Sequence, residues 1–422
     1  MLLRLPPAGR RRGATLVLVC ISLVGLFGMV AISLEGGLLL SERRNAQSTA
    51  DAAAQAAAAD LYYNHYANFG YDSGGTARKS ALVTATANGY ANDGTTTRVT
   101  VNIPPLTGEY AGKPSYVEVV TEYFHTRGFS SVFGTGKVPV RARSVAVGKP
   151  SAPDTGILVL DPSVKSAFNA NGGGRIVVKR VPVVVNSSSP EGSIAGGGSI
   201  VDAPSYQLVG NYATSGGGTF LGTMNTGVEP MEDPLKWLPV PDPSTMTIQS
   251  RKKEQLTSGT HVLYPGVYKG GISVSSTASL TLMPGIYYMD GGGFNYTGSG
   301  TLTGNGVMIY NAPGNGQADG INLAGQGAVQ LSAPTSGIYK GVMFFQDRTS
   351  TVAANISGGS NMTLTGTFYF ANALLSVTGS AGFVNMGSQY VSRTLNAQGS
   401  GTIYVDWDPD KVAQTRLITI VD

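Results

Sequence analysis

The feature that most constrains this chain is an uninterrupted apolar run near its start. Residues 14–34 read ATLVLVCISLVGLFGMVAISL and include no charged side chain. A helix rises 1.5 Å per residue, so this run would be about 30 Å long, which matches the hydrocarbon core of a bilayer. We therefore predict a single transmembrane helix that contacts the lipid bilayer through residues 14–34.

The charges around the run predict its orientation. Arg4 and Arg10–Arg12 precede it in a basic tail, residues 1–13, and Glu35 follows it. Positive charge stays on the cytoplasmic side, so we expect a cytoplasmic N-terminus and an extracytoplasmic bulk, periplasmic or on the cell surface. A secretory signal cleaved at the small-x-small site of residues 31–33 is the alternative. Both interpretations export the rest of the chain.

Residues 35–62 extend the helical pattern beyond the apolar run. The stretch 38–61 (LLLSERRNAQSTADAAAQAAAADL) has no Gly or Pro and is rich in alanine, the residue with the highest helix propensity. Its small side chains would allow a close approach either by a helix of another protein or by the chain's own downstream domain. The only cysteine, Cys20, lies in the apolar run, so an intrachain disulfide framework and a Cys-based zinc site are excluded.

Five features in this region occur in a characteristic order. They are Arg12-Gly13, Glu35-Gly36, Arg43-Arg44, Gln47 and Ala50-Asp51-Ala52-Ala53. Together they resemble the N-terminal segment of TadE/TadG-like proteins, the putative Flp pilus-assembly Tad domain. The resemblance covers about residues 10–62. It implies a single-span protein of the Flp (tight-adherence) pilus machinery, and an Ala-rich helix that contacts other pilus-assembly proteins.

The sequence departs from the prepilin-like members of this group at the cleavage site. Those relatives keep a glycine followed, five residues into the mature chain, by a glutamate. Gly13 could be that glycine, but the fifth residue after it is Leu18. We therefore expect an unprocessed chain that keeps its signal anchor.

Residues 63–150 have the pattern of a small α+β module. Alternating apolar and polar residues, turn signals and one helical stretch define its elements. The expected elements are a helix at 80–92 and strands at 98–103, 116–124 and 137–147. The Y-V-E-V and A-R-S-V-A strands are similar to strands of Tad-like proteins, which extends the resemblance to about residue 150.

The remainder is β-rich and punctuated by glycine, which accounts for 58 of the 422 residues. Residues 151–253 form a β-rich linker or early solenoid with a Pro-rich excursion at 229–243, where proline interrupts a sheet because it has no N–H to donate. Residues 254–422 form a Gly-rich β-solenoid. The segments 264–268 (YPGVY) and 283–287 (MPGIY) repeat at a spacing close to one coil of a parallel β-helix.

The predicted fold class is therefore mainly β. An N-terminal transmembrane α-helix extends into an Ala-rich helix and is followed by the small α+β module and a right-handed parallel β-helix-like solenoid. Each short strand would point apolar residues inward and Ser, Thr or Asn outward, with glycine at the corners. A β-sandwich is the alternative, because it also combines many short strands with Gly turns.

The sequence offers no catalytic, metal or cofactor site. Sugar hydrolysis needs two positioned carboxylates, whereas the only acids between 255 and 400 are Asp290, Asp319 and Asp347, on different coils. The three histidines, at 65, 125 and 261, lack metal-ligand spacing. The Gly-rich runs lack the context of a phosphate-binding loop. A net charge of +4 with 13% charged residues does not indicate nucleic-acid binding.

We therefore expect a non-enzymatic, membrane-anchored extracytoplasmic protein of Flp/Tad-type pilus assembly or surface adhesion. The first alternative is a carbohydrate-binding solenoid in which Tyr268, Tyr287 and Tyr288 stack on the sugar rings of a surface polysaccharide. A polysaccharide lyase or hydrolase that depends on Asp319 and Asp347 is less favoured.

Overall fold

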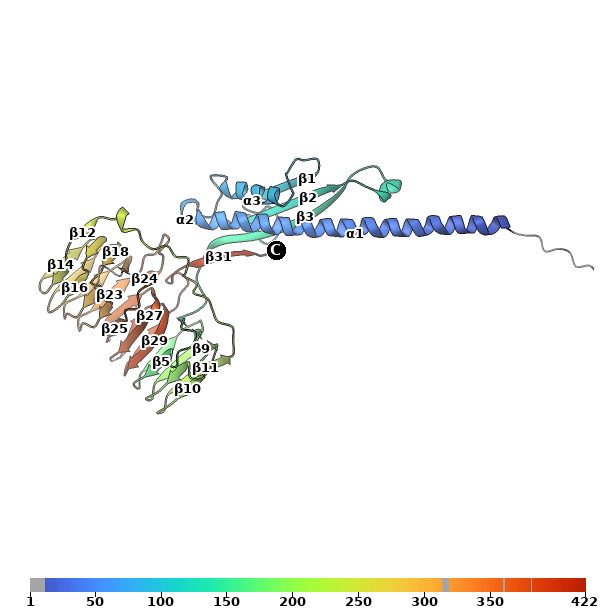
Figure 1. Ribbon diagram of the computed structural model, residues 1–422. Helices are drawn as coiled ribbons and strands as arrows, with labels where there is room; N and C mark the ends of the chain where they lie inside the picture. The colour runs from blue at the N-terminus through green and yellow to red at the C-terminus, as the bar shows by residue number, and fades with distance from the viewer. Residues whose placement is uncertain (1–11, 313–318, 360, 381) are drawn as a thin grey trace, which may run out of the picture. The chain divides into compact units, whose positions relative to one another are not determined.

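A computed structural model of the chain describes most of its residues. The described ranges are 12–312, 319–359, 361–380 and 382–422. Most of the predicted basic tail 1–13 lies outside them. The chain divides into two units, the first reaching Pro150 and including Leu417–Asp422, and the second spanning Ser151–Arg416 (Figure 1).

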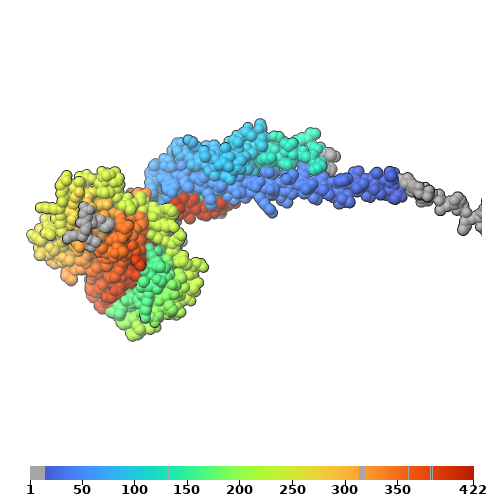
Figure 2. All heavy atoms as spheres, in the orientation of Figure 1, coloured from blue at the N-terminus to red at the C-terminus, as the bar shows by residue number. Residues whose placement is uncertain are grey.

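The N-terminal unit is built on one long helix, α1 (Arg12–Tyr63), so the predicted transmembrane and Ala-rich helices are continuous. Its first part is long and apolar enough to cross a membrane. Over residues 15–34 every described side chain is exposed except that of Ala31, which is half-buried. Figure 2 shows this part of α1 largely free of covering atoms.

The rest of the unit is the predicted α+β module. Its elements are α2 (His65–Asn68), α3 (Thr76–Ala87), β1 (Thr97–Asn102), β2 (Tyr116–His125), the 3₁₀ turn η1 (Phe129–Phe133), β3 (Val138–Ser151) and β31 (Thr415–Ile420). The strands form one sheet in the order β1-β2-β3-β31. Helix α3 starts earlier than the sequence predicts because the Asp72 carboxylate accepts the N–H groups of Ala77 and Arg78.

The alanine face of α1 packs inside this unit. Ala46, Ala53, Ala57 and other alanines of α1 are fully buried against three alanines of α3 and against valines of β1 and β2. Because alanine side chains are only methyl groups, the backbones of the neighbouring elements can lie close to that of α1, and Gly148 of β3 approaches it most closely. A Cβ placed on Gly148 would lie 1.7 Å from the carbonyl oxygen of Ala58. Of the two candidates for covering this face, the chain's own domain therefore occupies it.

The last residues of the chain return to the N-terminal unit. The sequence assigns all of 254–422 to the solenoid, but Leu417–Asp422 belongs to the first unit. There the Val145 N–H donates to the Asp422 carbonyl and the Val421 N–H donates to the Val145 carbonyl, both over 2.8 Å. The solenoid is thus inserted between two neighbouring strands of one sheet.

The second unit is a parallel β-solenoid of about 11 turns with three faces. The first face contains β12 (Ile248–Ser250), β15 (Gly266–Lys269), β18 (Gly285–Asp290), β21 (Val307–Ala312), β24 (Val342–Gln346), β27 (Thr367–Gly379), β29 (Gln389–Gly399), β4 (Ile157–Val159), β7 (Val183–Val185), β9 (Ile200–Leu208) and β11 (Thr219–Thr226). All its ladders are parallel, which confirms the solenoid and excludes the β-sandwich.

The other two faces follow the same succession of coils. The second contains β13 (Glu254–Leu256), β16 (Ile272–Val274), β19 (Phe294–Tyr296), β22 (Ile321–Leu323), β25 (Ala354–Gly358), the later parts of β27 and β29, β5 (Phe168–Asn171), β8 (Ser193–Ala195) and β10 (Tyr212–Thr214). The third contains β14 (Thr260–Leu263), β17 (Ser279–Leu282), β20 (Leu302–Gly304), β23 (Val329–Ser332), β26 (Met362–Thr365), β28 (Phe383–Met386), β30 (Thr402–Val405), β6 (Arg175–Val178) and the early parts of β9 and β11.

The coils are not stacked in the order of the sequence. The last coil, β29 and β30, pairs with the first one, β4 to β6. The chain therefore enters in the middle of the stack and winds to one end at β11. It then crosses to the opposite end at β12 and winds back until it meets its own beginning. The sequence did not predict this order.

Several side-chain contacts join the first and last coils, a junction that we call the seam. Arg393 Nε lies 2.9 Å from the carboxylate of Asp161, which is 2% exposed. Hydrogen bonds also cross the seam, from Asn169 to Asn396, from Gln389 to the Thr155 carbonyl, from the Trp407 indole to the Pro153 carbonyl and from the Arg180 guanidinium to the Trp407 carbonyl. The seam is thus bonded by side chains as well as by its backbone ladders.

The crossing between the two ends is made by residues 227–247, which we call the strap. It contains the predicted Pro-rich excursion and the short turn η2 (Pro243–Thr245). Leu235 and Leu238 of the strap are buried in an apolar cluster with residues of the first face. Arg348 donates to the carbonyls of Leu235 (2.6 Å) and Leu238 (2.8 Å). The strap is therefore held along the side of the solenoid.

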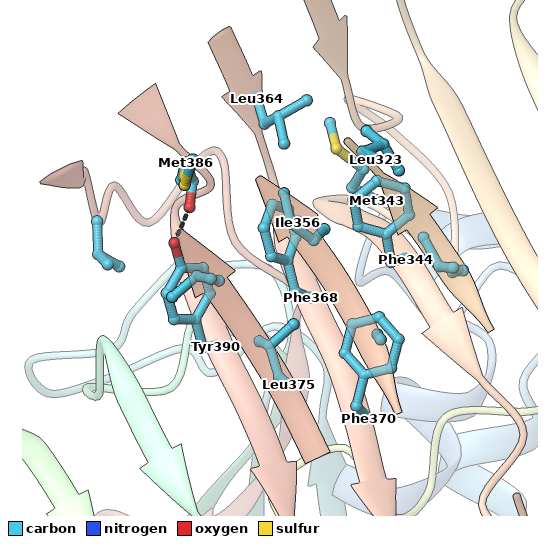
Figure 3. Packing of buried hydrophobic residues seen from close by; sticks show 14 of the residues in the cluster. Leu323, Met343, Phe344, Ile356, Leu364, Phe368, Phe370, Leu375, Met386 and Tyr390 are labelled. Atoms are coloured by element: carbon cyan, nitrogen blue, oxygen red, sulfur yellow. Dashed lines mark hydrogen bonds between the residues drawn. The ribbon is translucent and has the colours of Figure 1, made fainter. Parts of the chain in front are cut away.

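The interior of the solenoid is filled by stacked aromatic and aliphatic side chains (Figure 3). Phe368 lies between Phe344 and Tyr390. Its ring centroid is 4.9 Å from that of Phe344 and 5.2 Å from that of Tyr390. The hydroxyls of the tyrosines in this interior cluster donate to backbone carbonyls, as Tyr390 does to Met386. These bonds satisfy polar groups that would otherwise destabilise an apolar core.

The contact between Gly148 and Ala58 gives a test of the N-terminal packing. We expect Gly148→Ala to lower the free energy of unfolding of this unit by about 1–3 kcal/mol, because the added methyl group must push β3 away from α1. Thermal unfolding of the full chain in detergent, with hydrogen exchange of α3 and β2, would measure the loss. Gly136→Ala is the matched control, because a Cβ there meets no atom within 4 Å. Equal stability of the two variants would contradict this packing.

The seam gives a second test. Arg393→Met leaves the buried Asp161 carboxylate without its charged partner, so we expect the solenoid to lose about 1–3 kcal/mol of unfolding free energy. Arg175→Met is the control, because its pair with Asp202 also joins two coils but is exposed, and exposed pairs contribute about 0–1 kcal/mol. Denaturant unfolding followed by near-UV circular dichroism would compare them. A control variant as unstable as Arg393→Met would show that the seam pair has no special role.

Candidate functional site at the base of the apolar helix

Glu35 is the first charged residue after the apolar run, and the structure buries it. Glu35 is 6% exposed, although almost all the side chains that precede it in the apolar run are exposed. A carboxylate in such a place needs polar partners, since burial of an unpaired charge is strongly unfavourable. Those partners come from the connection between β2 and β3.

Three donors from this connection bind the Glu35 carboxylate. The Gly128 N–H and the Ser130 hydroxyl donate to Oε1 over 3.2 and 2.6 Å. The Ser130 N–H donates to Oε2 over 2.7 Å. His125 Nε2 lies 3.8 Å from Oε1. We call this arrangement of Glu35, His125, Gly128 and Ser130 the clamp.

The β2–β3 hairpin reaches Glu35 because β2 runs antiparallel to α1 and the two strands are bonded to the helix at two points. The Thr121 hydroxyl of β2 donates to the Ala46 carbonyl over 2.9 Å. The Gln47 amide donates to the Arg143 carbonyl of β3 over 3.1 Å. From these points the two strands extend along α1 toward the apolar run (Figure 1). Their connection bonds to Glu35 through Gly128 and Ser130.

The hydrogen bonds of the clamp stabilise the charged form of Glu35. The Ser130 hydroxyl and then the Ser130 N–H are the main causes that lower the pKa of Glu35 below its ordinary value, against the opposing effect of burial. The Gly128 N–H and the charge of His125 act in the same direction. The carboxylate is therefore ionised at neutral pH. With its oxygens engaged by these donors, its role is to hold the hairpin to the helix.

Next to the clamp, the turn η1 forms an apolar groove with the helix. Phe129 and seven residues of α1 line this groove, whose volume is about 670 Å³. The helix residues are Val24, Phe27, Gly28, Val30, Ala31, Ile32 and Leu34. The Phe129 side chain is 61% exposed. The groove therefore lies on the predicted transmembrane segment and is open.

The candidate acids of the solenoid are engaged elsewhere. Asp347 accepts hydrogen bonds from the Tyr310 hydroxyl (2.6 Å) and from Thr349. Asp319 lies 4.0 Å from the ammonium group of Lys253. Asp290 is the last residue of β18 and half-buried. Asp347 and Asp319 therefore have separate partners.

The three histidines lie at separate places. His65 Nδ1 is 3.3 Å from the Ser115 hydroxyl, and His261 Nε2 is 2.7 Å from the Ser258 carbonyl. His125 belongs to the clamp. Within the described ranges, no group of three or more His, Cys, Asp or Glu side chains could hold a metal ion.

Two of the three tyrosines proposed to stack on sugars are not available to a ligand. Tyr268 and Tyr287 are 1% and 0% exposed, so this part of the prediction is wrong. Their rings stack on each other inside the solenoid, with a distance of 5.9 Å between the ring centroids. Their hydroxyls donate to the carbonyls of Tyr264 and Met283, four residues earlier in each copy of the repeat. Tyr288 points to the other side of its strand and is half-buried.

Sequence reasoning missed the donors of the clamp. It used Glu35 only to mark the end of the apolar run. The available signal was the segment 128–131 (GFSS), a Gly- and Ser-containing turn between two predicted strands with an exposed aromatic residue. Gly128 and Ser130 are more than 90 residues away from Glu35, so their pairing follows only from the packing of the hairpin on α1.

Comparison with known proteins identifies the N-terminal segment. Residues 13–60 match the family model described as putative Flp pilus-assembly TadE/G-like. The match confirms the resemblance seen in the sequence and covers the apolar run, Glu35 and the alanine face. No match to the chain was found among curated proteins or among solved structures.

The clamp predicts that the hydrogen-exchange protection of the Gly128 and Ser130 amides depends on pH, and that Glu35→Gln removes this dependence. A carboxyl group whose pKa is lowered in the folded state stabilises that state above its unfolded pKa, and the stabilisation is lost as the pH falls through the lowered pKa. We therefore expect protection of the Gly128 and Ser130 amides above about pH 4.5, the ordinary value for Glu, and its loss below. Hydrogen exchange of the full chain in detergent, corrected for intrinsic rates, would measure it.

In Glu35→Gln the protection should be weaker and independent of pH over this range. Glu42→Gln, a substitution on the same helix outside the clamp, should behave like the wild type. If Glu35→Gln kept the wild-type profile, the clamp would not be the origin of the protection.

Proposed function

We propose that the chain is a non-enzymatic, single-pass membrane protein of Flp/Tad-type pilus assembly or surface adhesion. Residues 14–34 would cross the membrane with the N-terminus in the cytoplasm. The α+β module and the solenoid would lie on the extracytoplasmic side. Such a protein would bind other proteins or cell-surface components and would catalyse no reaction.

One observation carries this proposal. Within a single helix the described side chains of residues 15–34 are uncharged, mostly apolar and, apart from Ala31, exposed, whereas the alanine face that follows is buried in a folded module. Soluble proteins rarely expose such a continuous apolar surface. The family match spans both parts of this helix, which supports a membrane segment and a module acting together.

The solenoid supports a scaffold or adhesive role. Its outward positions carry polar uncharged residues that form ladders between coils, such as Asn322 with Asn355 (3.0 Å) and Thr281 with Thr303 (3.2 Å). Such surfaces offer amide and hydroxyl groups to a protein or to a surface polysaccharide. Partners from the pilus machinery would contact the part of α1 that the module leaves exposed, including Arg43 and Arg44.

Membrane extraction tests the proposal. We expect the full chain to resist extraction by alkaline carbonate and to be degraded by protease added to intact spheroplasts. Leu18→Arg combined with Val24→Arg should release it, since each Arg at the centre of a membrane helix costs about 2.5–3.5 kcal/mol. Leu106→Arg is the control, an equally exposed apolar residue within the module.

Two outcomes would contradict the proposal. The first is extraction of the wild-type chain by carbonate. The second is protection of the module and the solenoid from external protease while a known extracytoplasmic protein is degraded.

A further inference from the structure

The connection between β2 and β3 presents an apolar side chain at the level of the apolar run. Phe129 is one of the most exposed large apolar residues of the module. It does not point to the module's core but forms one wall of the groove on α1. In water this exposure would be unfavourable by about 1.5–3 kcal/mol relative to burial of the ring.

The helix residues of the groove place it within the predicted span. The groove extends along α1 from Leu34 back to Val24, and Val24 lies about 16 Å before Glu35 at 1.5 Å per residue. Ala31 is the one described residue of 15–34 that is half-buried. The turn therefore covers part of the surface that belongs to the bilayer if residues 14–34 cross it.

The clamp fixes the turn at this level. Gly128 and Ser130, on either side of Phe129, both donate backbone N–H groups to Glu35. These two backbone N–H groups of the tip are thereby satisfied, and hydrogen bonding of the backbone is what a non-helical segment needs where it touches hydrocarbon. The same bonds prevent the turn from moving away from the helix toward the module.

We propose that η1 is a second membrane contact, which dips into the outer leaflet beside the transmembrane helix and places Phe129 among phospholipid acyl chains. The occupant of the groove is then an acyl chain, because all its walls are apolar and continuous with the lipid-facing surface of residues 14–34. The inference rests on the proposed membrane anchor.

The single native cysteine allows a direct test. In the wild type, an environment-sensitive fluorophore on Cys20 reports the membrane span. In a Cys20→Ser background, Phe129→Cys reports the turn. Leu106→Cys reports the module. Leu106 is also exposed, and its N–H donates to Glu118, near the end of β2 that is remote from η1. The full chains are reconstituted in phosphatidylethanolamine and phosphatidylglycerol vesicles, with and without lipids that carry a nitroxide quencher on the acyl chain.

We expect the Phe129→Cys label to show at least half the blue shift of the Cys20 label and to be quenched by the nitroxide lipids, while the Leu106→Cys label shows neither. An aqueous emission at Phe129→Cys together with a lipid-exposed Cys20 overturns this inference and leaves the anchor intact. A label at Phe129→Cys that is shielded from water but not quenched by lipid also overturns it, because a protein then fills the groove. An aqueous emission at Cys20 contradicts the anchor itself.

The folding of the labelled chains is checked by a second measurement. Hydrogen-exchange protection of the Gly128 and Ser130 amides in Phe129→Cys should equal that of the wild type, since both bonds use backbone groups. If this protection is lost, Ser131→Cys in the same turn replaces it, with the same expected blue shift and quenching relative to Leu106→Cys. An aqueous, unquenched label at both positions overturns the inference.

Discussion

The ladder between the last and the first coils of the solenoid determines how the whole chain can be arranged. β3 and β31 are neighbours in one sheet, so the chain leaves and re-enters the N-terminal unit at nearby points. A solenoid wound in sequence order would separate its two ends by about 11 coils, or about 50 Å at the usual strand spacing. Stacking β29 and β30 on β4 to β6 brings the ends together, and the strap is the crossing that this order requires.

The two parts of helix α1 differ in side-chain composition and in exposure. Up to Leu34 most of its side chains are large and apolar, whereas from Ala46 its buried face is made mainly of alanine methyl groups. Large side chains suit contact with lipid, and small ones allow α3 and Gly148 to approach the backbone closely. Glu35 lies between the two parts, and its carboxylate bonds the helix to the hairpin of the module.

Much of the architecture could be predicted from local patterns. The lack of Gly and Pro after the apolar run predicted the long continuous helix, and alternation predicted β1, β2 and β3 to within a few residues. The repeated PG(V/I)Y segments predicted the solenoid because each coil reuses the same corner. In these elements the residues that decide the structure are close in sequence.

The features that were missed depend on distant partners. Each coil has similar alternation, so the pattern cannot say that Leu395 stacks on Phe168. The inward direction of Tyr268 and Tyr287 is decided by the hydroxyl bonds to Tyr264 and Met283, which an alternating pattern does not reveal. The clamp joins Glu35 to a turn that the hairpin carries to it. In all three cases the deciding contact forms only when the chain has folded.

The permuted winding has a consequence for how the solenoid can come apart. An ordinary β-helix unravels from a terminal coil, where a loose chain end can peel away. Here the coils at both extremities, β10–β11 and β12–β14, are internal segments of the polypeptide tethered through the strap, and the two ends of the wound chain are buried in mid-stack. Fraying at either tip can therefore release only a closed loop, so neither tip of the solenoid offers a free end from which an exopeptidase or a mechanical pull could start.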